Sequence, residues 1–191
     1  MNLNWTNKER TLLEDQISHE KICIQKYTDY ANLASDQQLK KIFENHAQTE
    51  QEHLNTLNQL LNGQMPQLNQ QGNAMASQAQ QQQQGSTMTN QFFQPQEQGG
   101  VQVGQSNQQQ QQAGEHFQLQ DNLTPKQSQD QNLCNDLLMT EKYVSGTYDT
   151  AIFEFRDPQV REILNHIQKE EQQHGEAIFN YMQAQGMYNP Q

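Results

Sequence analysis

Apolar residues recur at helical spacing over two long stretches of the chain, residues 10–62 and 129–186. In each stretch they fall at i, i+3, i+4 and i+7, which places them on one face of a helix. Each stretch breaks once, at Asp36 in the first and at Asp157-Pro158 in the second. Because Asp is a favoured N-cap and Pro is favoured at the first helical position, a new helix begins after each break. The pattern predicts four helices, at residues 10–34, 37–62, 130–155 and 158–185.

The two periodic stretches are repeats of one another. A shift of 121 residues aligns them without a gap, so that apolar positions, charged positions and the helix break coincide. The identical pairs include Leu12 with Leu133, Glu20-Lys21 with Glu141-Lys142, Tyr27 with Tyr148, Asp36 with Asp157, Ile42 with Ile163, Glu50-Gln51 with Glu171-Gln172, and His53 with His174. Each repeat is therefore predicted to form an αα-hairpin, and the two hairpins together an all-α four-helix bundle.

A glutamine-rich segment separates the two hairpins. It covers residues 63–128, where 24 of 66 positions are Gln and four are charged, with no sustained apolar pattern. This composition cannot offset the entropy lost on ordering, so we expect a disordered or loosely collapsed insertion. It is either a tether long enough to span the bundle or a segment that self-associates through stacked side-chain amides. The predicted organisation is a first hairpin at 10–62, the insertion at 63–128 and a second hairpin at 129–191.

Composition and charge exclude several classes of partner. The formal net charge is −11 and no cluster of Lys or Arg is present, which argues against nucleic acid and anionic membranes. The amino terminus has no apolar stretch typical of a signal peptide, and no apolar run reaches about 18 residues, so we expect synthesis in the cytoplasm. The two cysteines, Cys23 and Cys134, lie near the apolar faces and are predicted to be buried, reduced thiols.

Glutamate and histidine interrupt the apolar faces of all four predicted helices. A carboxylate in a bundle core is costly unless it is paired or bound to a metal. One Glu from each of two helices plus Glu-x-x-His from each of the other two is the ligand set of carboxylate di-metal bundles. A single Glu-x-x-His pair arises by chance in a Glu-rich helix, but two pairs in register, each 30 residues after another inward Glu, favour a metal site. The predicted metal ligands are Glu20, Glu50, His53, Glu141, Glu171 and His174.

The ligand types indicate iron or manganese. Four glutamates carry four negative charges, which two divalent cations cancel, and carboxylate oxygens with one imidazole per metal suit these two elements. No organic cofactor and no specific catalytic residue is predicted. His46 lies one turn before Glu50, but its repeat partner is Ile167, so we expect a role in the core or behind the ligands. For Tyr27 and Tyr148 we expect core packing, with a hydrogen-bonding or radical role as the alternative.

The ligand pattern resembles that of the ferritin-like superfamily across both hairpins. The second hairpin is also similar to the coat F domain of spore coat proteins from endospore-forming bacteria, over roughly residues 130–191. Its ending carries the resemblance, with Tyr181-Met182, Gly186-Met187-Tyr188 and Pro190. The resemblance implies a ferritin-like bundle that is made in the mother cell and deposited in the spore coat, with other coat proteins as partners.

Two functions follow as expectations. The first is a structural protein of the spore coat with a di-metal site in its bundle. The second is a di-iron or di-manganese oxidoreductase that acts on peroxide or Fe(II). The glutamine-rich insertion favours the first, because it adds nothing evident to redox chemistry, whereas the complete ligand set favours the second.

Overall fold

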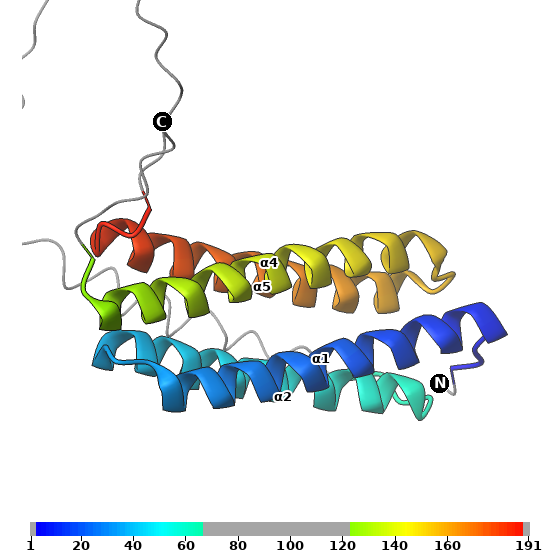
Figure 1. The fold of residues 1–191 in the computed structure, drawn as a ribbon. Helices are drawn as coiled ribbons and strands as arrows, with labels where there is room; N and C mark the ends of the chain where they lie inside the picture. Colours follow the sequence, from blue (N-terminus) through cyan, green and yellow to red (C-terminus); the bar gives the residue numbers. More distant parts are fainter. Residues whose placement is uncertain (1–2, 67–122, 189–191) are drawn as a thin grey trace, which may run out of the picture. The chain divides into compact units, whose positions relative to one another are not determined.

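The computed structural model describes residues 3–66 and 123–188, and these residues form four α-helices (Figure 1). The helices are α1 (Asn7–Leu33), α2 (Gln37–Leu61), α4 (Pro125–Glu154) and α5 (Pro158–Ala184). No strand occurs in the described part of the chain, so the all-α prediction is confirmed. None of these four helices combines the length and hydrophobicity that a membrane crossing requires. The expectation of disorder in the glutamine-rich insertion concerns mainly residues 67–122, which lie outside the described residues.

Each helix begins at a residue whose side chain caps it. The carboxylate of Asp36 accepts from the backbone N–H of Leu39, and Asp157 caps α5 in the same way, as predicted. The other two helices begin earlier than predicted, α1 at Asn7 and α4 at Pro125. Both start with a capping box, in which the N-cap threonine and the third helical residue satisfy each other's backbone N–H. The boxes are Thr6 with Glu9 and Thr124 with Gln127.

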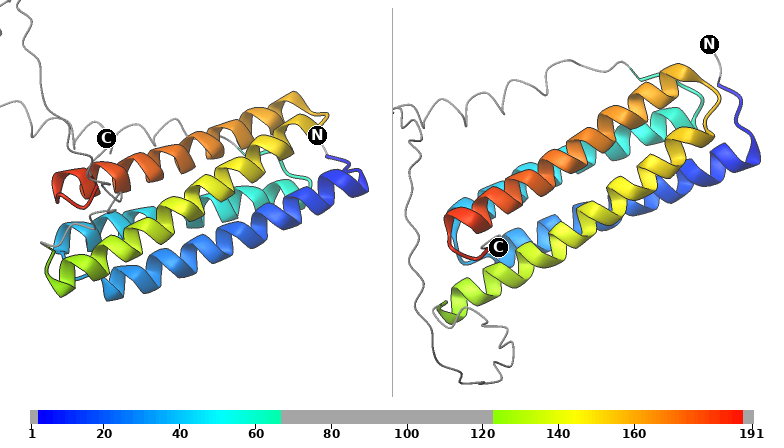
Figure 2. Two further views of the ribbon diagram at one scale, coloured as in Figure 1. Left: turned by 45° about the horizontal axis from the view of Figure 1, so that its top comes forward. Right: turned by 90° about the horizontal axis from the view of Figure 1, so that it is seen from above.

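The helices pack as two antiparallel pairs, α1 with α2 and α4 with α5, and the pairs join through α1 against α4 and α2 against α5 (Figures 1 and 2). The end of α2 lies beside the start of the chain, where the Leu3 N–H donates to the Gly63 carbonyl at 3.3 Å. The start of α4 lies at the other end of the bundle, beside the turn between α1 and α2. The end of α2 and the start of α4 are therefore a full bundle length apart.

The core is made by the four apolar faces that the sequence predicts, with one correction. The apolar pattern predicts Ile24 on the inward face of α1, but Ile24 is only half-buried, and Cys23 lies in the core instead. The buried positions of α1 advance by three or four residues, through Leu13, Ile17, Glu20, Cys23 and Tyr27, and position 24 falls at the edge of this stripe. Cys23 and Cys134 are both buried and free, which confirms the prediction for the thiols.

A reciprocal pair of carboxylates locks the two hairpins together. Glu9 of α1 accepts from the backbone N–H of Arg156, in the turn between α4 and α5, at 3.0 Å. Its repeat counterpart Asp130 of α4 accepts from the backbone N–H groups of Ser35 and Asp36, in the turn between α1 and α2, at 2.8 and 3.1 Å. The two interactions are related by the same repeat that relates the helices, so the bundle has a pseudo-twofold arrangement.

Replacing Glu9 by Ala should lower the free energy of unfolding at pH 7 by about 1–3 kcal/mol, because it removes half of a capping box and one of the two carboxylates that join the hairpins. Burial opposes ionisation here, but hydrogen bonds from Arg156 and Thr6 lower the pKa of Glu9 from 4.5 to about 2. Its contribution is therefore present above about pH 4.5 and is lost as the pH falls towards 2. Urea denaturation at pH 7 and at pH 2 tests both statements.

The exposed Glu14, on the same helix, provides the control for Glu9. Glu14→Ala should change stability by less than about 0.5 kcal/mol. Equal effects of the Glu9 and Glu14 substitutions would show that the carboxylate of Glu9 does not hold the hairpins together.

Candidate metal centre

The six predicted ligands meet in the core, although they come from four different helices. Glu20 lies on α1, Glu50 and His53 on α2, Glu141 on α4, and Glu171 and His174 on α5. All six are buried, and the most exposed of them, His174, has a relative accessibility of 5%. The spacing of Glu and His along α2 and α5 turns both side chains of each Glu-x-x-His pair to the same face.

The six residues form two groups that share two glutamates. Glu20 and His53 make one group with Glu50 and Glu171, while Glu141 and His174 make the other group with the same two glutamates. Within each group, one potential ligand atom from every residue lies within 4.8 Å of the others. Two neighbouring cation positions would thus have Glu50 and Glu171 in common, with one further Glu and one His each.

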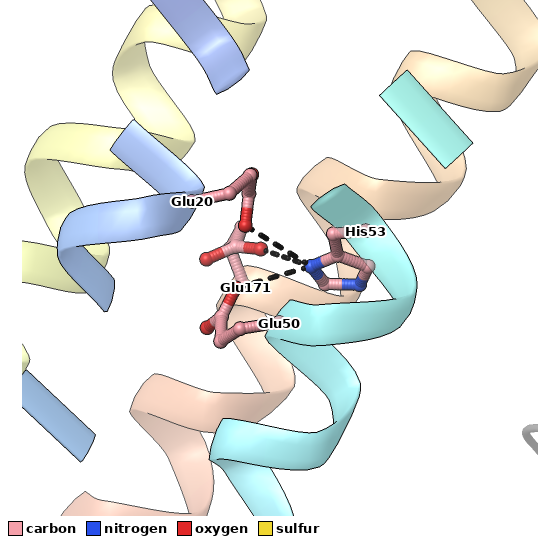
Figure 3. Close-up of side chains that lie close together, drawn as sticks. All are labelled: Glu20, Glu50, His53 and Glu171. Atoms are coloured by element: carbon pink, nitrogen blue, oxygen red, sulfur yellow. Dashed lines mark hydrogen bonds and ion pairs between the residues drawn. The ribbon is translucent and has the colours of Figure 1, made fainter. Parts of the chain in front are cut away.

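The imidazole of His53 points into the carboxylate cluster (Figure 3). Its Nδ1 lies 2.9 Å from Glu171 Oε1, 3.2 Å from Glu50 Oε2 and 3.6 Å from Glu20 Oε2. A single ring nitrogen can donate to only one of these three carboxylates at a time. The opposite nitrogen, Nε2, lies 2.9 Å from Glu170 Oε2, so Glu170 fixes the ring with Nδ1 towards the cluster.

His174 occupies the equivalent place in the second hairpin but has different support. Its Nδ1 lies 2.9 Å from Glu50 Oε1, and its ring stacks on His46 with 4.1 Å between the ring centroids. His46 belongs to neither group, in keeping with the expected role behind the ligands. The residue equivalent to Glu170 is Thr49. The two halves of the centre are therefore similar in their ligands and different in what surrounds them.

Two buried tyrosines connect the hairpins at the centre. The hydroxyl of Tyr27 on α1 donates to Glu141 on α4, and the hydroxyl of Tyr148 on α4 donates to Glu20 on α1. Both rings are completely buried, as the core-packing expectation required. Each tyrosine also hydrogen-bonds a glutamate that belongs to only one of the two groups. Such hydrogen bonding is the alternative role expected for the two tyrosines.

The four glutamates differ in how readily they ionise. Burial raises the pKa of Glu20 to about 8, and burial together with the charge of Glu50 raises the pKa of Glu171 to about 7. Burial and the neighbouring Glu171 raise the pKa of Glu141 well above its ordinary value. Burial also acts against ionisation of Glu50, but hydrogen bonds from His174 and His53 lower the pKa of Glu50 below its ordinary value. In the metal-free bundle near neutral pH, Glu50 therefore carries charge while the other carboxyls tend to hold protons.

Several oxygens of this cluster lack any hydrogen-bond partner. They are Glu20 Oε2, Glu141 Oε2 and both carboxylate oxygens of Glu171. Glu171 Oε1 lies 2.9 Å from His53 Nδ1, but that nitrogen hydrogen-bonds Glu50 instead. A buried carboxylate oxygen without a partner is costly, and a cation would supply the missing interaction. Oxygen-rich groups with one imidazole nitrogen each suit iron and manganese. The donor set and the unpartnered oxygens thus fit two divalent cations.

Sequence analysis missed Glu170, the support of His53. Glu170 is adjacent to Glu171 and therefore falls off the inward face of α5, so that its position in the sequence is typical of a surface residue. Only the packing of α5 against α2 brings it to His53 Nε2. No local sequence signal distinguishes it from the other charged residues of KEEQQHGE.

Comparison with known proteins gives one match. Residues 129–191, which comprise most of α4, all of α5 and the carboxy terminus, match the model of the Coat F domain family. No curated protein and no solved structure matches the chain. The match covers the second hairpin, in agreement with the resemblance found in its sequence.

Proposed function

We propose that the protein, whose residues 129–191 match the Coat F domain family, is a structural component of the spore coat whose bundle holds a carboxylate-bridged di-metal site. The family match is the observation that carries the coat assignment. The metal assignment is supported by the buried cluster, whose carboxylate oxygens lack partners and fall into two overlapping groups. The proposed ligands are Glu20, Glu50, His53, Glu141, Glu171 and His174.

The helix arrangement supports a place in the ferritin-like superfamily. Two antiparallel hairpins joined by one long crossover, with ligands projecting inwards from all four helices, are typical of that class. Here α2 ends and α4 begins at opposite ends of the bundle, which requires such a crossover. The sequence repeat and the reciprocal tyrosine–glutamate pairs add the expected pseudo-twofold symmetry.

In this proposal Glu50 and Glu171 would be shared by the two ions, and each ion would also be held by one further Glu and one His. A bound pair of iron or manganese ions supplies redox chemistry and charge neutralisation. The residues of the chain position and insulate the centre: Tyr27 and Tyr148 hold Glu141 and Glu20 in place, and Glu170 orients His53. Because the ligands come from all four helices, bound ions would also tie the two hairpins together.

A di-iron or di-manganese oxidoreductase acting on peroxide or Fe(II) is the second candidate. The observation that favours it is the pair of tyrosine hydroxyls bonded to Glu20 and Glu141. Besides holding these glutamates in place, buried tyrosines next to a redox-active centre would be suited to a radical role.

The location of the protein in the cell separates the two functions. A tagged copy should be absent from growing cells, appear in the mother cell during sporulation, and fractionate with other coat proteins extracted from spores. A tagged Glu171→Gln variant should behave in the same way, because the coat role depends on the fold and not on metal. Equal abundance in growing cells, together with peroxide or Fe(II) turnover, would contradict the structural function and favour the oxidoreductase.

Self-association through the glutamine-rich segment stays a hypothesis, because most of that segment lies outside the described residues.

A further inference from the structure

An open cavity of about 700 Å³ lies between α4 and α5. Its lining includes Glu141 and Glu171, two of the proposed metal ligands, which are buried and form its floor. The exposed side chains of Lys142, Asp149 and Glu176 surround its mouth. The cavity therefore runs from the surface of the second hairpin to the side chains of Glu141 and Glu171, whose unpartnered carboxylate oxygens stay buried behind it.

The repeat shows that this cavity results from specific small residues. Three lining positions of the second hairpin carry smaller side chains than their counterparts in the first. The pairs are Ser145 against Ile24, Gly146 against Gln25, and Gly175 against Leu54. In the first hairpin Leu54 packs against the hydrophobic core, at the position where Gly175 leaves space in the second. The second hairpin thus departs from its own repeat at the positions beside Glu141 and Glu171.

The walls of the cavity are mainly apolar. Leu138 lies on the α4 side, and Phe179 and Tyr188 form an edge-to-face aromatic pair, with 5.1 Å between ring centroids, on the α5 side. Gln168 uses its side-chain amide to donate to the Ser145 carbonyl at 3.1 Å, so one polar lining group is already satisfied within the protein. Such walls favour an apolar molecule over a strongly hydrated one.

The volume of the cavity and the charges at its mouth indicate which class of ligand it would bind. A water molecule takes about 30 Å³ of liquid volume, so the cavity is far larger than dioxygen or peroxide requires and matches a small organic molecule. At the mouth the carboxylates of Asp149 and Glu176 outnumber the amine of Lys142, and the net charge of the chain is −11. These charges disfavour an anionic ligand.

We propose that the cavity between α4 and α5 binds a neutral, largely apolar organic molecule, with one end next to Glu141 and Glu171. Binding of the molecule in the cavity does not depend on the proposed function. Contact between its inner end and a metal centre does rest on the proposed function. Bound there, the molecule would be the substrate or ligand of the centre, and the first hairpin would serve as its closed counterpart.

Gly175→Leu is the variant that tests the cavity, because it copies the residue found in the first hairpin. A Cβ at position 175 would lie 3.8 Å from Glu141 Cβ and 4.0 Å from Leu138 Cδ2, which are ordinary contacts. The helix therefore accepts a side chain at this position, and the remaining atoms of leucine would occupy the part of the cavity next to Glu141 and Leu138. Gln173→Leu is the control, since Gln173 is exposed on the same helix and does not line the cavity.

The measurement is titration of the full-length protein with the neutral fluorescent probe N-phenyl-1-naphthylamine. The wild type and Gln173→Leu should bind the probe, whereas Gly175→Leu should bind it at least about tenfold more weakly. The anionic probe 8-anilino-1-naphthalenesulfonate should bind the wild type more weakly than the neutral probe. Circular dichroism melting of the three proteins checks that Gly175→Leu is folded.

Two results would overturn the proposal: equal binding of the neutral probe by wild type and Gly175→Leu, or tighter binding of the anionic probe. Titration of the same proteins with Mn(II) tests the proposed function separately. Because Gly175 supplies no ligand, Gly175→Leu should take up Mn(II) as the wild type does. Loss of probe binding in Gly175→Leu supports the cavity even if no protein takes up Mn(II), a result that would contradict only the di-metal site.

Discussion

Addition of Fe(II) under anaerobic conditions, or of Mn(II), should raise the melting temperature of the metal-free protein by about 10 °C or more. Ligand binding to the folded state alone stabilises it by about 2.7 kcal/mol per site at a hundredfold excess over Kd, and two sites are expected. For a bundle of this size each kcal/mol corresponds to roughly 3–5 °C. Differential scanning calorimetry measures the shift, and isothermal titration should give two ions per chain.

Glu171→Gln should abolish most of this shift, because Glu171 belongs to both groups and neither of its oxygens makes a hydrogen bond. The metal-free variant should be as stable as the wild type or more so, since an amide of the same shape replaces a carboxyl that burial destabilises. Glu162→Gln, at an exposed position of the same helix, is the control and should keep the full shift. A wild-type melting temperature that no metal changes would show that the cluster is not a metal site.

The metal-free protein should lose stability as the pH rises from about 5 to about 8. In the folded bundle the carboxyl groups of Glu171 and Glu20 titrate near pH 7 and 8, while in the unfolded chain they lose their protons near 4.5. The carboxylates around His53 also hold its pKa above the ordinary value, in spite of burial. The folded state therefore binds more protons than the unfolded state throughout this range, which makes stability fall with rising pH. The expected loss is about 2 kcal/mol or more.

Bound metal should reverse the dependence of stability on pH. Bound cations displace the protons of the carboxyl groups, so metal affinity increases with pH and the gap between loaded and metal-free melting temperatures should widen. The double substitution Glu20→Gln and Glu171→Gln should reduce the loss of stability of the metal-free protein between pH 5 and 8, and the remaining loss would come from Glu141 and His53. Glu50 does not interfere, because its lowered pKa affects stability only below about pH 4.5. A metal-free wild type whose stability rises over this range would contradict the assignment of buried, protonated carboxyls.

The candidate centre has unequal halves in spite of its symmetric ligands. His53 is held by Glu170, whereas His174 stacks on His46, and the cavity of about 700 Å³ is lined by the second hairpin. A duplicated hairpin gives each half the same ligands, and later differences between the copies can then close one side and open the other. The ligand set alone therefore cannot distinguish a structural centre from a reactive one, while the cavity can be tested directly.

The sequence by itself determined the helices, the repeat and the inward positions of the six candidate ligands. A helix imposes its own period, so apolar stripes and the polar residues within them are visible without tertiary structure. Glu20 and Glu171 could be identified because their repeat partners Glu141 and Glu50 sit at the same register. Helix starts were less exact, since the capping boxes at Thr6 and Thr124 lie outside the periodic pattern.

Only the tertiary structure decided how residues from different helices meet. The contacts of Tyr27 with Glu141, of His53 with Glu170 and of Glu9 with Arg156 each join residues more than a hundred positions apart. Helical periodicity says which face a side chain occupies, but not which side chain on another helix lies opposite it. The cavity beside Gly175 likewise depends on the distance between α4 and α5 as well as on the missing side chains. These features depend on how the helices pack, which no single helix encodes.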